Sequence, residues 1–69
     1  MAKKYYFIGI GGISMSALAI FLKLSGEQVS GSDINLNETM QNLDKFNITY
    51  NIGHFAKNIE EYSPDIVVI

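Results

Sequence analysis

The stretch Phe7-Ile8-Gly9-Ile10-Gly11-Gly12-Ile13-Ser14-Met15-Ser16 determines how this chain folds, because an apolar strand runs through a glycine cluster directly into an apolar helical pattern. Phosphate-binding βαβ units have this order of strand, glycine-rich turn and helix. At Gly9 the chain turns tightly out of the strand, and a side chain at Gly11 or Gly12 would keep a ligand away from the backbone. The stretch therefore predicts an anion site at the N-terminus of the helix that begins at Ile13.

Four polar positions extend this predicted site. Ser14 stands where the third glycine of the motif is usual, and its hydroxyl can donate to a phosphate oxygen. Asp33 follows 19 residues later at the end of a predicted strand, where an acid contacts a ribose hydroxyl or caps the following turn. Ser32 beside it is interpreted as a loop residue that satisfies backbone groups. His54 follows the third predicted strand at the same sheet edge, as a ligand contact or as an exposed or structural histidine.

Strand and helix patterns alternate along the rest of the chain. Apolar and β-branched runs predict strands at 5–10, 28–33, 48–52 and 65–69, and helical spacing predicts helices at 13–24, 38–46 and 56–62. Asn35 or Asn37 is expected to cap the second helix. Crossovers between parallel strands are right-handed in ~98% of cases. These units therefore predict an α/β fold, a Rossmann-like parallel sheet in order 3-2-1-4, with two helices on one face and the third on the other.

Composition limits the classes of protein to which the chain can belong. Its 69 residues form at most one small domain, and the absence of cysteine excludes a disulfide or a thiolate metal site. The net charge of −2, with five basic residues, argues against nucleic-acid binding. No apolar run approaches the ~18 residues of a membrane span. No cluster of carboxylates with histidine indicates a metal site. We therefore expect a cytoplasmic domain that binds neither nucleic acid nor membrane.

The last residues, Ile66-Val67-Val68-Ile69, are the most β-prone run of the chain. Natural domains rarely finish inside a core strand, since an open strand edge favours aggregation. We therefore expect residues 1–69 to be one domain of a longer protein, truncated after the fourth strand. We also expect self-association through that strand or through the sheet face that only the segment 54–62 is available to cover.

The glycine-rich stretch from Phe7 to Ala19 resembles the opening of the Mur ligases. Two later segments agree with this family, Val29-Ser30-Gly31-Ser32-Asp33 and Ile52-Gly53-His54, as do Asn58-Ile59 and the strand at 65–68, so the resemblance covers essentially the whole chain. It implies an N-terminal Rossmann-like domain that binds the UDP end of UDP-N-acetylmuramate instead of a dinucleotide. The UDP-contacting residues that follow from motif and resemblance together are Gly9, Gly11, Gly12, Ile13, Ser14, Ser32, Asp33 and His54.

The resemblance also implies the chemistry of the parent protein, an ATP-dependent ligase of three domains in peptidoglycan synthesis. ATP would phosphorylate the lactyl carboxylate of UDP-N-acetylmuramate, and the amine of L-alanine would attack the acyl phosphate. The Gly11-Gly12 doublet is more similar to the alanine-adding member than to the related murein tripeptide ligase. ATP and Mg²⁺ belong to later domains of the family. Residues 1–69 are therefore expected to bind substrate without a catalytic residue, metal or cofactor of their own.

Two other functions remain open from the residues alone. In an NAD(P)- or FAD-binding domain of an oxidoreductase, Asp33 would hold the adenosine ribose, and its spacing from Ser14 fits that role equally well. A nucleotide-sensing regulatory module would share the same turn without any catalytic partner domain. Comparison of UDP-sugar binding with NADH binding distinguishes the first alternative from the ligase.

Overall fold

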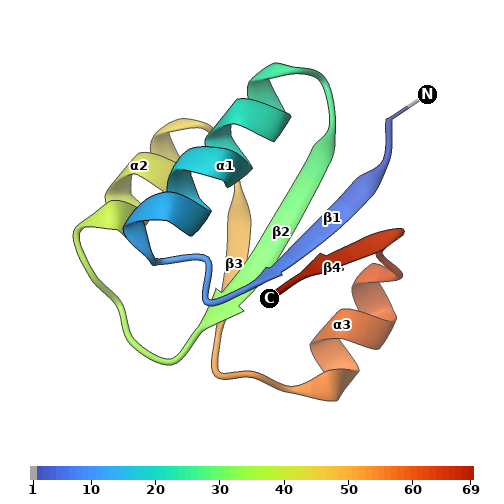
Figure 1. Ribbon diagram of the computed structural model, residues 1–69. Helices are drawn as coiled ribbons and strands as arrows, with labels where there is room; N and C mark the ends of the chain where they lie inside the picture. Colours follow the sequence, from blue (N-terminus) through green and yellow to red (C-terminus); the bar gives the residue numbers. More distant parts are fainter. Residues whose placement is uncertain (1) are drawn as a thin grey trace.

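A computed structural model describes residues 2–69 as one four-stranded parallel sheet with helices on both faces. The strands lie in the order β3-β2-β1-β4, which confirms the predicted topology. Helices α1 and α2 cover one face, and α3 lies on the other (Figure 1), as the right-handed crossovers predicted. The elements are β1 (Lys4–Ile8), α1 (Ile13–Leu24), β2 (Gln28–Asp33), α2 (Thr39–Lys45), β3 (Thr49–Ile52), α3 (Ala56–Tyr62) and β4 (Ile66–Val68).

The first strand is shorter than predicted, because the chain leaves the sheet at Gly9. Gly9 has a φ of +85°, a left-handed conformation that glycine adopts without strain. The N–H groups of Gly9 and Ile10 then both donate to the carbonyl oxygen of Ser32, at 2.8 and 3.0 Å. The prediction of a strand continuing to Ile10 was therefore wrong, and this residue instead turns into the core, where it is fully buried.

Helices α1 and α3 and strand β2 have the predicted bounds, and the other three elements differ from the predictions by one residue at one or both ends. Helix α2 spans Thr39–Lys45 instead of 38–46, and β3 and β4 are each shorter than expected. Asn37 does not cap α2 as its N-cap residue, which is Glu38. Its side-chain oxygen nevertheless accepts a hydrogen bond from the N–H of Thr39 at 3.0 Å, so it satisfies one donor at the start of this helix.

An apolar core fills the space between the sheet and the pair α1 and α2. Gly31 of β2 makes this packing possible, because Ile10 crosses directly over it. A Cβ atom at Gly31 would lie 2.8 Å from Ile10 Cδ1 and 2.5 Å from the carbonyl oxygen of Phe7. The buried core residues are Phe7, Ile10, Ala19, Val29, Met40, Leu43 and Ile48.

The opposite face of the sheet is more polar, which explains why β2 has few apolar residues. Ser30 and Ser32 are both buried there, and the Ser30 hydroxyl donates to the carbonyl oxygen of Thr49 at 2.9 Å. Tyr6 is fully buried on this face, and its ring centroid lies 5.9 Å from that of Tyr62 in α3. Hydroxyl groups that bond to backbone or side-chain partners thus replace apolar contacts over much of this layer.

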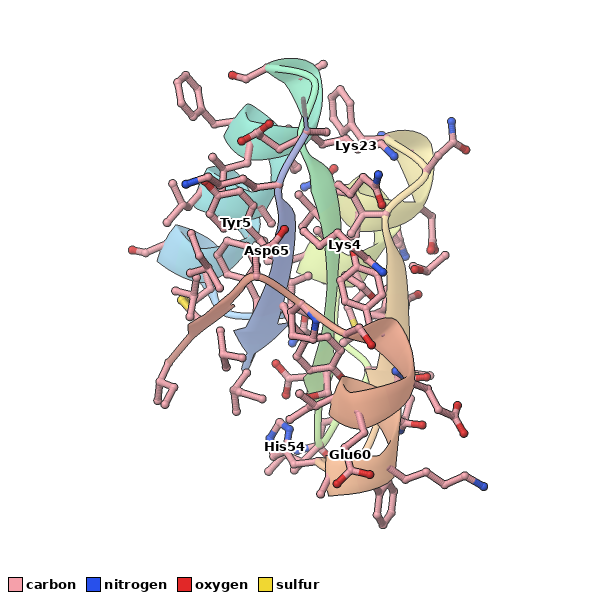
Figure 2. The ribbon with its side chains drawn as sticks, turned by 90° about the vertical axis from the view of Figure 1, so that its right-hand side faces the viewer. Lys4, Tyr5, Lys23, His54, Glu60 and Asp65 are labelled. Atoms are coloured by element: carbon pink, nitrogen blue, oxygen red, sulfur yellow. The ribbon has the colours of Figure 1, made fainter. Side chains whose placement is uncertain are left out.

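The strand β4 is attached to β1 by a reciprocal pair of hydrogen bonds. The N–H of Lys4 donates to the carboxylate of Asp65 at 2.8 Å, and the N–H of Asp65 donates to the carbonyl oxygen of Lys4 at the same distance. The ammonium group of Lys4 also lies 4.5 Å from the centre of the Tyr62 ring, and Figure 2 shows this side of the molecule. Among the described helices, none is both long and apolar enough to cross a membrane.

Candidate functional site

The carboxyl ends of the parallel strands bring the predicted site residues to one edge of the sheet. Three segments meet there: the glycine turn after β1, the end of β2 and the turn after β3. The N–H of Gly53 donates to the carbonyl oxygen of Asp33 at 2.7 Å, so the last two segments are directly connected. Figure 2 shows His54 at the end of the sheet toward which the strands point. The residues gathered at this edge are Gly9, Gly11, Gly12, Ile13, Ser14, Ser32, Asp33 and His54.

The glycine turn uses its own N–H groups inside the protein. Gly9 and Ile10 donate to Ser32 O, Gly11 donates to Asp33 Oδ2 at 2.8 Å, and Gly12 donates to Gly9 O at 3.1 Å. The N–H groups of this turn are therefore occupied before any ligand arrives. A phosphate group at this edge has to find its donors further along the chain.

The first turn of α1 supplies such donors. The N–H groups of Ile13, Ser14 and Met15 have no acceptor among residues 2–69, whereas the N–H of Ser16 donates to Gly12 O at 2.8 Å. No acidic residue lies in this turn, and the exposed Ser14 hydroxyl adds another potential donor. The free donors thus begin at Ile13, two residues later than the expected start of backbone contact at Gly11. Met15 was not among the predicted residues, although its position in the first helical turn could have identified it.

Asp33 braces the glycine turn from the end of β2. Its Oδ2 accepts the N–H of Gly11, and its Oδ1 accepts the N–H of Ile34, each at 2.8 Å. The turn-capping role considered from the sequence is therefore present, together with a second contact to the glycine turn. Oδ1 also accepts the N–H of Asn35 at 3.5 Å, whereas Oδ2 retains a further acceptor position. Contact between Asp33 and a ligand stays a prediction.

Thr39 and Asn37, which the sequence analysis did not assign to the site, also enclose Gly11. The Thr39 hydroxyl lies within hydrogen-bonding distance of the Gly11 carbonyl oxygen and of Asn37 Oδ1. A Cβ atom at Gly11 would lie 2.8 Å from both Asn37 Nδ2 and Asp33 Oδ2. Gly11 is thus enclosed by polar groups from the segment after β2, and the lack of a side chain at this position leaves room for them. The sequence analysis considered Asn37 only as a helix cap and did not single out Thr39.

Ser32 and His54 form a side-chain pair beside the turn after β3. Ser32 is fully buried, and its hydroxyl oxygen lies 2.7 Å from Nδ1 of the exposed His54. The interpretation of Ser32 as a loop residue was wrong, because it lies within β2 and its hydroxyl contacts an imidazole instead of the backbone. Gly53, with a φ of +96°, makes the turn that carries His54 back over the strand end.

A separate open hollow of about 410 Å³ lies at the other end of β3. Its lining includes Tyr50, whose pKa is raised above 10.0 by a hydrogen bond with Asp44, by burial and by the charge of that carboxylate. The hollow is at the beginning of β3, whereas His54 follows its end. It therefore belongs to a different part of the surface from the candidate site.

The chain is similar to known proteins over nearly its whole length. The family model described as "Mur ligase family, catalytic domain" matches residues 4–69. A UDP-N-acetylmuramate–L-alanine ligase from Clostridium botulinum (strain Eklund 17B / Type B) is 50% identical over 66 residues, which are 96% of this chain and 14% of that protein.

Two solved structures extend the likeness to three dimensions. The UDP-N-acetylmuramate–alanine ligase of Thermotoga maritima is 42% identical, with a TM-score of 0.85 over 94% of this chain and 15% of its own. A murein peptide ligase of Psychrobacter arcticus is 28% identical, with a TM-score of 0.91 over 97% of this chain and 14% of its own. The chain thus spans about one seventh of the length of these relatives. Since the family model matches nearly the whole sequence, the chain belongs to the Mur ligase family.

Proposed function

We propose that this chain is the N-terminal, UDP-binding domain of an ATP-dependent ligase that joins L-alanine to UDP-N-acetylmuramate in peptidoglycan synthesis. The Clostridium botulinum protein that is 50% identical over 96% of this chain is named as that ligase. The observation that carries the proposal is the set of free N–H groups at Ile13, Ser14 and Met15, at the sheet edge that also holds His54.

The diphosphate of UDP is assigned to the N-terminus of α1. Three N–H groups and the helix dipole favour negative charge there, and Gly12 leaves the approach to the backbone open. The uridine end then lies toward Asp33 and His54, at the ends of the two neighbouring strands. Backbone donors carry most of the phosphate contact in this arrangement, consistent with a chain whose net charge is −2.

ATP and Mg²⁺ are assigned to other domains of the parent enzyme. Among residues 2–69, no three histidine or acidic side chains are grouped so as to hold a metal ion, and no step of the proposal depends on one here. The 69 residues are expected to bind the nucleotide substrate and to lack ligase activity alone. A cytoplasmic location stays a prediction.

A dinucleotide-binding domain is the alternative that the family match makes less favourable. In such a domain the acid at the end of the second strand accepts hydrogen bonds from ribose hydroxyls. Asp33 could serve either kind of nucleotide in this way, because its Oδ2 keeps one acceptor position beside the N–H of Gly11. A nucleotide-sensing module would use the same site, and a ligase assay of the complete parent protein separates it from the proposed function.

Calorimetric titration with UDP, UDP-N-acetylmuramate and NADH tests the proposal. We expect both uridine nucleotides to bind and NADH not to compete; tighter binding of NADH would overturn the assignment. Gly12→Val is the informative variant, since a Cβ there meets its nearest atom, Gly9 O, at an ordinary 3.5 Å. It should weaken UDP binding while the fold persists. Ser25→Ala, at the other end of α1, is the matched control and should bind UDP as the parent chain does.

Self-association remains a separate proposal that now rests on the edge of β4. Helix α3 lies against the sheet face that was expected to be poorly covered, and Tyr62 packs there. The edge strand still exposes Ile66 and Val67, by 37% and 42% of their surfaces. Light scattering should show a dimer for the unsubstituted 69-residue chain and a monomer for Val67→Lys, because a charge on the edge strand opposes strand pairing. A stable monomer at high concentration would contradict the proposal.

A further inference from the structure

The pair formed by Ser32 and His54 connects the interior of the sheet to its ligand-facing edge. Ser32 has no exposed surface, and its Oγ lies 2.7 Å from His54 Nδ1. Among residues 2–69, this imidazole nitrogen is the only hydrogen-bond partner of the Ser32 hydroxyl. His54 is exposed, so the rest of its ring remains open to a ligand.

The chemistry of this pair selects one direction for the hydrogen bond. If Nδ1 carried the proton and donated to Ser32, the buried hydroxyl hydrogen of Ser32 would have no acceptor, which is an unfavourable arrangement. If Ser32 donates instead, Nδ1 accepts with its lone pair and the hydroxyl hydrogen is satisfied. A neutral imidazole that accepts at Nδ1 carries its proton on Nε2.

We infer that Ser32 is a positioning residue that holds His54 as the Nε2–H tautomer, so that the ring presents a hydrogen-bond donor to an acceptor oxygen of the bound nucleotide. This inference deepens the proposed function and rests on it for the identity of the ligand. Ser32 itself makes no ligand contact in this arrangement, unlike the direct UDP contact first expected of it. Its effect on affinity passes entirely through His54.

The tautomer can be measured without any ligand, because His54 is the only histidine of the chain. Selective ¹⁵N labelling of histidine gives one imidazole, whose two nitrogens report their protonation directly by NMR in the neutral form. We expect a protonated Nε2 and an unprotonated Nδ1 in the parent chain. In Ser32→Ala, the population of this form should fall toward that of free histidine under the same conditions. Predominant protonation at Nδ1 in the parent chain would overturn the inference.

Ser30 provides a matched control on the same strand and face. It is also a buried serine, but its hydroxyl contacts Thr49 instead of His54. Ser30→Ala should therefore leave the tautomer of His54 and the affinity for UDP unchanged, although it removes a buried hydroxyl. A tautomer shift as large in Ser30→Ala as in Ser32→Ala would show a general loosening of β2 and would count against a specific role of Ser32.

A double-mutant cycle tests whether Ser32 acts through His54. Ser32→Ala should weaken UDP binding about threefold to tenfold, the range for loss of one ordinary hydrogen bond. In a His54→Ala background the same substitution should have no further effect. An equal loss in both backgrounds would overturn the inference. If UDP binds none of these proteins, the proposed function fails. The tautomer of His54 in the unsubstituted chain still tests the inference in that case, and it does so even if Ser32→Ala does not fold.

Discussion

Gly11→Ala tests whether the glycine turn is held by the protein itself. A Cβ atom at this position would lie 2.8 Å from Asp33 Oδ2 and from Asn37 Nδ2. Both atoms are the ends of side chains, so they can move away. The carboxylate, however, moves only by weakening its hydrogen bond to the N–H of Gly11. The substitution should therefore lower the stability of the fold by about the contribution of this hydrogen bond, and not by the larger amount that a clash with immovable backbone would produce.

The magnitude follows from the groups involved. A hydrogen bond to a charged group contributes about 1.5–3 kcal/mol. Replacement of glycine by alanine also reduces the conformational entropy of the unfolded chain, which stabilises the folded state by about 0.4–1 kcal/mol. We expect Gly11→Ala to lower the free energy of unfolding by about 1–2 kcal/mol. For a domain of this size, that corresponds to a fall in Tm of about 4–16 °C.

Urea unfolding followed by far-UV circular dichroism measures this difference, with Gly12→Ala as the control. A Cβ atom at Gly12 meets Gly9 O at 3.5 Å and Met15 Cγ at 3.8 Å, and the φ of −67° suits any residue. The control should therefore stay within about 0.5 kcal/mol of the parent chain. If Gly11→Ala is as stable as the parent, or if both variants lose stability equally, the brace around Gly11 does not stabilise the fold.

Two further substitutions test the core and the hollow at the start of β3. Gly31→Ala should lower the free energy of unfolding by about 3 kcal/mol in total, which is more than Gly11→Ala. The reason is that its Cβ would lie 2.5 Å from the backbone oxygen of Phe7, which cannot move aside as a side chain can. Urea unfolding of the two variants measures the difference. The raised pKa of Tyr50, caused first by its hydrogen bond with Asp44, means that the folded state favours the neutral phenol. This stabilisation is present below pH 10 and is lost as the pH rises through the folded-state pKa, so the stability difference between the parent chain and Tyr50→Phe should shrink above pH 10.

The sequence by itself determined the topology, because the relevant signals are local. Alternating strand and helix patterns set the number of units, and the handedness of crossovers then placed each strand beside its neighbour. The bounds of α1 show how local the signal is: helical spacing predicted a helix at 13–24, and α1 spans Ile13–Leu24. Because all strands are parallel, the same patterns also predicted that the three turns of the candidate site lie at one edge of the sheet.

Only the tertiary structure decided which groups at that edge are free. Asp33 and Gly11 lie 22 residues apart, as do Ser32 and His54, and Thr39 reaches Gly11 across 28 residues. Such pairs depend on the register of neighbouring strands and on the course of two loops, which no periodic pattern encodes. The glycine motif predicted an anion site, and the free N–H donors of the structure lie within a few residues of that motif. Hydrogen bonding inside the turn moved its free donors to the first turn of α1, because a backbone N–H that already has a buried acceptor is not available to a ligand.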